Sequence, residues 1–380
     1  MTIAMGLIAN RPIALASGMG INAIVAYTLC LGGAAVDWRV AMAIVFLEGI
    51  VILILVACGL RKAVMDAIPV SLRHAIGIGI GLFIAFIGLK GGGIIVANES
   101  TILGLGDLSA PVAIVSLIAI AVAVVLQVLN VKGGLLISII VATIAGIPLG
   151  VTPLPSSWSF GLDFSAFAAP FQTIPGTDTM AIAQVFLQPA LLLFVFSLLM
   201  SDFFDTMGTV VAVGEQADFV DENGDVKDIQ PILMVDSAAA AVGGFVGASS
   251  VTSFVESTSG AAAGARTGLS NLVVGILFVI FAFASPIIGM VSSSATCGAL
   301  VVVGYLMLSD VINIDWTRIE FAFPAFATIM GIPMTYSITN GIGFGFISYC
   351  VIMLVTGKAR EVKPLMWVAA IAFLAMFILS

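Results

Sequence analysis

The sequence predicts an all-α polytopic membrane protein that forms a single integral membrane domain over residues 1–380. Of its residues, 61% are hydrophobic and only 9% are charged, whereas soluble domains carry about 25% charged residues. Apolar runs long enough to cross a bilayer core of about 30 Å recur along the whole chain. Two of these runs are interrupted by glycine and polar residues, and such paired interruptions are typical of transporters built from inverted repeats.

The expected spans lie between glycine, proline and charge breaks in the apolar pattern. The first set is 12–30, 39–58, 75–96, 109–129 and 133–149, and the second is 186–213, 231–247, 268–290, 295–312, 321–338 and 340–356, with a short Gly/Ser/Thr-rich piece at 248–264 and a last apolar stretch at 364–379. We therefore assign residues 1–149 to an incomplete first repeat, 150–185 to an external connection, 186–356 to a second repeat and 357–380 to a C-terminal tail.

The basic residues support this order of spans. If the chain enters the first span from the cytoplasm and the spans alternate, 11 of the 13 Lys and Arg residues fall on the cytoplasmic side. The segments 97–111 and 150–185, both assigned outside, contain neither Lys nor Arg. This is the asymmetry of the positive-inside rule, so we expect a multi-pass protein of the cell membrane.

The two interrupted segments are ASGMGINA at 16–23 and GASSVTSFVESTSG at 247–260. A broken helix exposes unpaired backbone groups only where they line a cavity, so the pair predicts a binding site near the middle of the membrane. The late segment has two spans before it in its half, whereas the early segment has only 15 residues before it. This arithmetic predicts that two N-terminal spans are absent from this sequence.

Two acidic residues lie inside stretches that lipid could not surround. Asp205 and Glu256 stand among apolar, small or hydroxylic residues, and an ionised side chain at the bilayer centre costs about 2.5–3.5 kcal/mol. Asp205 shares a helix face with Thr209 at spacing i, i+4, and Thr206 adds a second hydroxyl group. Such residues are expected to face a polar ligand or to share a proton.

Glu256 lies in a hydroxyl-rich stretch that includes Ser253 and Ser257. This chemistry suits the edge of a nucleobase or a sugar. The alternative, small residues that allow close helix packing, explains the Gly, Ala and Ser residues but not the carboxylate. From the early interrupted segment, Asn22 brings an amide group, beside Met19 and Gly20.

Other polar residues favour structural interpretations. We expect Asp202 to be a structural acid, Asp236 to mark the start of a helix, and Glu48 to form a direct or water-linked pair with Lys90, because an unpaired buried charge is costly. Cysteine spacing indicates no metal site or disulfide, and no pattern calls for a cofactor. The net charge of -8 disfavours nucleic acid as a partner; the lipid bilayer and a second copy of the chain are the expected macromolecular neighbours.

Several motifs together resemble one transporter family. They are RPIALASGMGINAIVAYT, AIGIGIGLFIAFIGL, SDFFDTMGT, TSFVESTSGAAAGARTGLSNLVVG and IDWTRIEFAFPAFATIMGIPMTYSITNGIGFGFISY. The chain resembles the adenine/guanine/hypoxanthine permeases, the AzgA-like branch of the nucleobase:cation symporter superfamily that includes uracil permease.

The resemblance implies a seven-plus-seven inverted-repeat fold with interleaved core and gate subdomains, of which about 12 of 14 spans are present here. It also implies purine import coupled to H⁺, with Na⁺ as the other candidate ion. On this basis Asp205 and Glu256 contact base nitrogens, and the helix breaks near Asn22 and Phe254 close the pocket.

These expectations combine into a secondary transporter, not an enzyme, that imports purine nucleobases by alternating access. Burial favours the neutral form of a carboxyl group, so Glu256 or Asp205 is expected to couple proton entry to substrate entry. Two alternatives stay open. One is an anion transporter of the sulfate or bicarbonate type on the same scaffold, whose site would use helix N-termini and a cation. The other is a truncated binding protein that does not transport.

Overall fold

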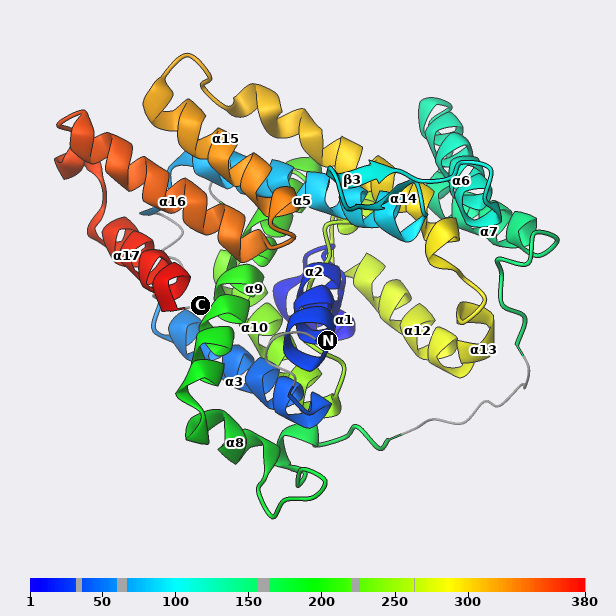
Figure 1. The fold of residues 1–380 in the computed structure, drawn as a ribbon, viewed down its shortest axis with the longest axis horizontal. Coiled ribbons are helices and arrows are strands. Elements are labelled where there is room, and N and C mark those ends of the chain that lie inside the picture. Colours follow the sequence, from blue (N-terminus) through cyan, green and yellow to red (C-terminus); the bar gives the residue numbers. More distant parts are fainter. Residues whose placement is uncertain (32–35, 60–66, 156–163, 221–225, 263, 380) are drawn as a thin grey trace. The chain divides into compact units, whose positions relative to one another are not determined.

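The computed structural model describes residues 1–31, 36–59, 67–155, 164–220, 226–262 and 264–379 (Figure 1). The chain divides into two compact units. Unit 1 comprises Met1–Gly77, Asp163–Leu277 and Asn313–Ser380, and unit 2 comprises Ile78–Leu162 and Phe278–Ile312. All the residues singled out as a candidate site belong to unit 1, so the site can be described within that unit alone.

In its described residues, unit 1 consists of helices, one pair of short strands and the connections between them. Its elements are α1 (Thr2–Ala4), η1 (Met5–Ala9), β1 (Leu15–Ser17), α2 (Met19–Ala23), η2 (Ile24–Cys30), α3 (Trp38–Ala57), η3 (Ala169–Phe171), α8 (Ala181–Leu187), α9 (Pro189–Gln216), α10 (Ile229–Val246), β4 (Val251–Ser253), α11 (Ser257–Ala262), most of α12 (Leu269–Phe283), α15 (Ile319–Met334), α16 (Ile338–Val355), η5 (Ala359–Glu361) and α17 (Pro364–Leu379).

Unit 2 contains most of α5 and a second strand pair. Its elements are α5 (Val70–Gly91, which begins in unit 1), β2 (Ile95–Asn98), β3 (Ile102–Leu105), α6 (Pro111–Val128), α7 (Gly134–Gly146), α13 (Ser285–Ile288), α14 (Ser293–Met307) and η4 (Leu308–Asn313). Within this unit α6 packs against α7 and α14.

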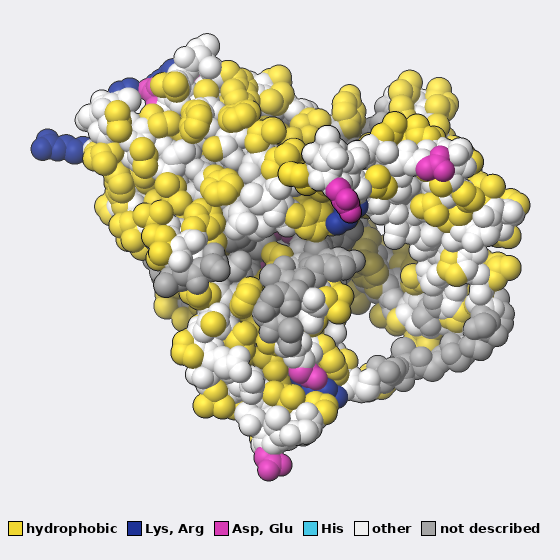
Figure 2. Space-filling view, viewed as in Figure 1, with side chains coloured by type: hydrophobic (Ala, Val, Ile, Leu, Met, Phe, Trp, Pro, Cys, Tyr) yellow, Lys and Arg dark blue, Asp and Glu magenta, His cyan; other side chains and the backbone are white. Residues whose placement is uncertain are grey.

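The expected spans are confirmed as helices over most of their length. Within the described ranges, six helical segments are long and apolar enough to cross a membrane: α3, α5, α6, α9 as far as Val211, α10, and Ser293–Asn313. Shorter apolar helices lie in five further expected segments, among them the tail helix α17. Figure 2 shows the same character on the surface, where hydrophobic side chains dominate the face in view and charged side chains are few.

Two expected spans need correction. The first, 12–30, is not one helix: a strand over Leu15–Ser17 interrupts it, and only then does helix begin at Met19. The third, 75–96, begins earlier at Val70 and ends at Gly91. It ends there because the following Gly93 adopts a left-handed φ of 71° and the chain turns into the β2–β3 hairpin.

Helices α3 and α10 pack at backbone contact. A Cβ atom at Gly49 would lie 2.2 Å from the backbone nitrogen of Ala241, and one at Gly244 would lie 2.4 Å from that of Phe46. Only glycine permits this approach, because any larger side chain would force the helices apart. The pair therefore forms a rigid support, and β4 packs on its α10 side.

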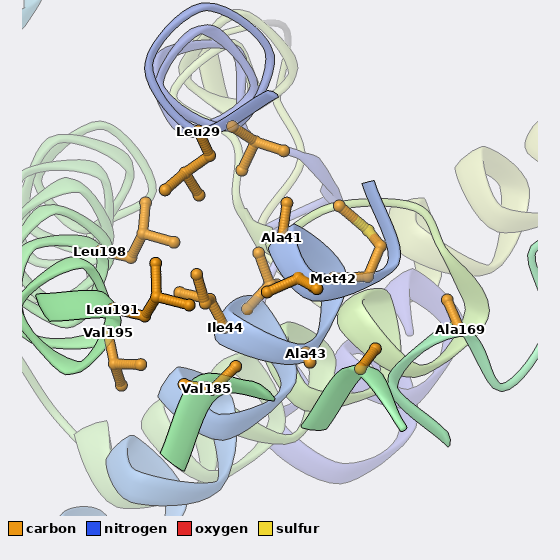
Figure 3. Packing of buried hydrophobic residues seen from close by; sticks show 14 of the residues in the cluster. Leu29, Ala41, Met42, Ala43, Ile44, Ala169, Val185, Leu191, Val195 and Leu198 are labelled. Atoms are coloured by element: carbon orange, nitrogen blue, oxygen red, sulfur yellow. The ribbon is translucent and has the colours of Figure 1, made fainter. Parts of the chain in front are cut away.

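Helix α9 lies beside α3 and changes chemistry along one face. In its first half, Leu191, Val195 and Leu198 are buried and meet Ile44 of α3 (Figure 3). Continued at helical spacing, the same stripe reaches Asp202 and then Asp205. A helix that is anchored by apolar packing at one end thus carries acids into the interior at the other.

The tail helix α17 packs onto α16 and α9. The Phe373 ring is fully buried and lies 5.6 Å from the ring of Phe346 on α16 and 6.3 Å from that of Phe196 on α9. Aromatic pairs at these separations contribute about 0.5–1.5 kcal/mol beyond their buried area. The tail is therefore an integral part of unit 1.

Candidate functional site

The two interrupted segments meet as an antiparallel strand pair. In β1 and β4 the register places Leu15 opposite Ser253 and Ser17 opposite Val251. The ladder continues at both ends: the Gly18 N–H donates to the Ser250 carbonyl at 3.0 Å, and the Phe254 N–H donates to the Ala14 carbonyl at 2.9 Å. The prediction that the two segments lie together is confirmed. Each strand leads directly into a short helix, α2 or α11.

Asp236 holds β4 in place. One carboxylate oxygen accepts hydrogen bonds from the Ser253 N–H at 3.0 Å and from the Ser253 hydroxyl at 2.8 Å. The other oxygen accepts from the Thr206 hydroxyl of α9 at 2.7 Å. The expectation that Asp236 marks a helix start is wrong: it lies well inside α10 and is fully buried. Its position inside an apolar span was the signal that could have revealed it.

Three of the predicted hydroxyl groups make bonds within the protein. Thr206 also lies 3.0 Å from the Thr252 hydroxyl. The Ser257 hydroxyl accepts a hydrogen bond from the Ala14 N–H at 3.0 Å. Together with Ser253, these residues tie α9, β4 and the chain before β1 to one another. They therefore hold the shape of the site.

Asp205 and Glu256 differ from the other acids nearby in their access to solvent. Both side chains are half-buried, whereas Asp202, Asp236 and Glu48 are fully buried. The carboxylates of Glu256 and Asp236 lie close enough to Asp205 to act on it electrostatically. Two acids, one from α9 and one from the β4–α11 connection, thus lie near each other and are both only partly buried.

The early break contributes an amide group. Asn22 lies in α2, is half-buried, and its side-chain oxygen accepts a hydrogen bond from the Ser17 hydroxyl at 2.8 Å. Helix α2, which also contains Gly20, packs against α9; the side chain of Met19 lies outside the described part. Phe254 is half-buried directly after β4, and Thr209 is buried one turn after Asp205.

A family profile described as "Permease family" matches residues 1–344. The chain belongs to this permease family. It is 39% identical over 376 residues to the guanine/hypoxanthine permease PbuG of Bacillus subtilis. The aligned region covers 99% of this chain and 83% of PbuG. It is 36% identical over 378 residues to the adenine permease AdeQ of Escherichia coli, and the aligned region covers 100% of this chain and 83% of AdeQ.

Solved structures establish the fold of the permease. The transmembrane domain of the cyanobacterial bicarbonate transporter BicA matches with a TM-score of 0.64 at 15% identity, over 89% of this chain and 88% of that one. SLC26A9 matches with a TM-score of 0.61 at 14% identity. This match covers 94% of the present chain and 59% of the SLC26A9 chain. The permease is therefore a multi-pass membrane protein with an inverted-repeat transporter fold.

One further prediction concerns buried charge in the permease, the pairing of Glu48 with Lys90. Glu48 is fully buried in α3 and accepts a hydrogen bond from the Ser250 hydroxyl at 3.4 Å. Lys90 belongs to unit 2 and is exposed in the last turn of α5, so the proposed Glu48–Lys90 pair stays a prediction. Among the described residues, no three His, Cys, Asp or Glu side chains are placed to hold a metal ion.

Proposed function

We propose that the permease imports purine nucleobases across the cell membrane and binds them where the β1–α2 and β4–α11 segments cross. The observation that carries the proposal is the pair of half-buried acids, Asp205 and Glu256, beside a hydrogen-bond network that joins α9 to β4. The names of the relatives, guanine/hypoxanthine and adenine permeases, support the substrate class.

The chemistry of the two acids suits a purine. An ionised carboxylate only accepts hydrogen bonds, and purines present ring N–H groups and, in adenine and guanine, an exocyclic amine. Glu256 accepts from ring N–H groups on one edge of the base, and Asp205 supports a second edge directly or through water. Hydrogen bonds that involve a charged group are the stronger ones.

The same pair supports coupling to a cation. Repulsion between two neighbouring carboxylates is relieved when one of them binds a proton. Proton entry and base entry can therefore favour each other at one site. The site then opens in turn to the two sides of the membrane, as the inverted-repeat scaffold allows.

An anion substrate is disfavoured by the same groups. BicA shares only the fold at 15% identity, and two acids close together repel a bicarbonate or sulfate ion. A base that donates hydrogen bonds meets no such repulsion.

Uptake of radiolabelled guanine, hypoxanthine, adenine and uracil in a host without purine permeases tests the proposal. We expect purine accumulation that collapses with an uncoupler and persists when Na⁺ is replaced. Glu256→Gln and Asp205→Asn should abolish accumulation, whereas Asp107→Asn, in an exposed loop, should preserve it. Unchanged uptake in both acid variants would refute the site, and binding without counterflow in proteoliposomes would refute transport.

A further inference from the structure

The hydroxyl of Ser17 and the amide of Asn22 form a hydrogen-bonded pair in the early break. The Ser17 hydroxyl donates to the Asn22 side-chain oxygen at 2.8 Å. Both side chains are half-buried. We propose that Ser17 is a positioning residue that fixes the amide of Asn22 so that its NH₂ group donates to an acceptor atom of the bound purine. This inference rests on the proposed function and specifies how the site reads its substrate.

The geometry of the amide group indicates which way the NH₂ group of Asn22 faces. An asparagine side chain carries an acceptor oxygen and a donor NH₂ on opposite edges of one planar group. When the oxygen accepts from Ser17, the two N–H bonds lie on the edge away from Ser17. The group then offers donors to a ligand. To offer its oxygen instead, the amide would have to turn over and exchange donor and acceptor roles with the Ser17 hydroxyl.

Both partners of the pair are attached to the strand crossing. Ser17 ends β1 opposite Val251. The next residue, Gly18, donates its N–H to the Ser250 carbonyl at 3.0 Å, and its own carbonyl accepts the Asn22 N–H at 2.8 Å. A Cβ atom at Gly18 would lie 2.8 Å from Thr252, so the early break sits tightly on β4. The amide is therefore held at the same crossing that positions the acids.

The polarity of the amide complements the rest of the site. On the α9 and β4 side, Asp205 and Glu256 offer acceptors when ionised. A purine also carries acceptor atoms, such as N3, N7 and the O6 of guanine, which carboxylates cannot satisfy. A buried acceptor without a donor costs about 1–3 kcal/mol. Asn22, oriented by Ser17, supplies the missing donor and allows the site to recognise both kinds of group on one base.

Transport assays with analogues test this inference. The variants are Ser17→Ala, Ser17→Thr and Asn22→Asp. Ser348→Ala is the matched control, because this half-buried hydroxyl lies in α16, outside both breaks, and donates to a backbone carbonyl. The competitors of guanine uptake are 3-deazaguanine, 7-deazaguanine and 2-aminopurine, which lack N3, N7 and O6 respectively. Surface abundance of each variant is measured in parallel, and uptake is normalised to it.

We expect the wild type to disfavour one analogue by about 5-fold or more, the value of one hydrogen bond. Ser17→Ala should raise the guanine concentration for half-maximal uptake about 5-fold and remove most of that discrimination. Ser17→Thr should restore both, and Ser348→Ala should leave both unchanged. Asn22→Asp keeps an acceptor for Ser17 but removes the donors, so it should lose at least as much affinity as Ser17→Ala.

Two results would overturn the inference. One is a Ser17→Ala variant that discriminates between guanine and the analogues as strongly as the wild type does. The other is an Asn22→Asp variant that binds guanine as well as the wild type, which would mean that the oxygen faces the base. If the wild type takes up no purine at all, the proposed function fails first, and this inference fails with it. If the wild type takes up purines and Ser17→Ala takes them up with the same affinity and discrimination, only the inference about Ser17 fails and the proposed function stands.

Discussion

The two breaks share a backbone plan but differ in how they are held and in what they present. Each is a three-residue strand followed by a short helix, and the strands pair in antiparallel register. The early strand is anchored by Thr2, whose hydroxyl donates to the Leu15 carbonyl at 2.6 Å and accepts its N–H at 3.0 Å. The late strand is anchored by the fully buried carboxylate of Asp236.

The two breaks also differ in the side chains that they present. The early break offers neutral groups, Ser17 and Asn22, whereas the late break offers Glu256 next to the acid of α9, Asp205. An inverted repeat reproduces a backbone shape twice, but each copy can be given its own side chains. We infer that the early break supplies a donor and the late break supplies the ionisable acceptors.

We expect the strongest loss of uptake from changes to Glu256 of the late break and to the neighbouring acid of α9, Asp205. Glu256→Gln and Asp205→Asn each remove a charged acceptor and should lower guanine uptake about 10–100-fold, the range for a hydrogen bond to a charged group. Initial rates at several guanine concentrations, measured against wild type, check this. An equally large loss from Asn22→Ala would contradict the division of roles between the two breaks.

Removal of the late anchor should have the next largest effect. Asp236→Leu leaves the Thr206 and Ser253 donors without their acceptor, and each buried unsatisfied donor costs about 1–3 kcal/mol. We expect lower thermal stability in detergent and at least about a 10-fold loss of uptake. Ser237→Ala is the control, since that buried hydroxyl donates to a backbone carbonyl in the same helix. A stable Asp236→Leu protein with full uptake would show that β4 does not need this anchor.

The early anchor should matter less. Thr2→Val keeps the shape of the side chain and removes two neutral hydrogen bonds to Leu15, each worth about 0.5–1.5 kcal/mol. We expect a modest loss of thermal stability and a guanine uptake rate within about 5-fold of wild type, with no change in its dependence on an uncoupler. The comparison of Thr2→Val with Asp236→Leu measures how unequal the two anchors are.

The smallest effect is expected at a charged cluster outside the breaks. Glu320 precedes the apolar run of α15, and its contacts with Lys358 at 2.7 Å and Arg318 at 2.8 Å lower its pKa from 4.5 to about 2. Its contribution to stability is fully present above the unfolded pKa and is lost only as the pH falls through the folded value.

Between pH 5 and 8 that contribution is therefore constant. Glu320→Gln should leave the shape of the uptake profile unchanged across this window, whatever its effect on the amount of folded protein. Uptake at half-unit pH steps for wild type and variant checks this. A shifted profile would place part of the pH dependence outside the breaks and weaken the contrast between them.

Much of this arrangement could be predicted from the sequence. The spans were predictable because an apolar run must match the bilayer thickness, and the breaks were predictable because Gly18 and the serines before Val251 interrupt such runs. The prediction that Asp205 and Glu256 belong to the site followed from the cost of charge inside a membrane. The spacing of Asp205 and Thr209 also placed them on one helix face.

Other features could not be predicted because they join residues that are distant in sequence. Asp236 looked like a helix-start residue, yet its partners Thr206 and Ser253 come from α9 and β4. The hydroxyls of Thr206 and Ser253 were predicted to contact a ligand, and in the fold both donate hydrogen bonds to the Asp236 carboxylate. Lys90 looked buried by its neighbours and is exposed at a helix end.

Hydropathy and the cost of burying charge act locally along the chain, so the amino-acid sequence was enough to predict a polytopic membrane protein with two interrupted spans and with acids in its interior. The fold was needed to distinguish the acid that anchors a strand, Asp236, from the acids that are only partly buried, Asp205 and Glu256. That distinction depends on the pairing of β1 with β4 and on the close contact of α3 with α10, which bring together groups that no local pattern connects.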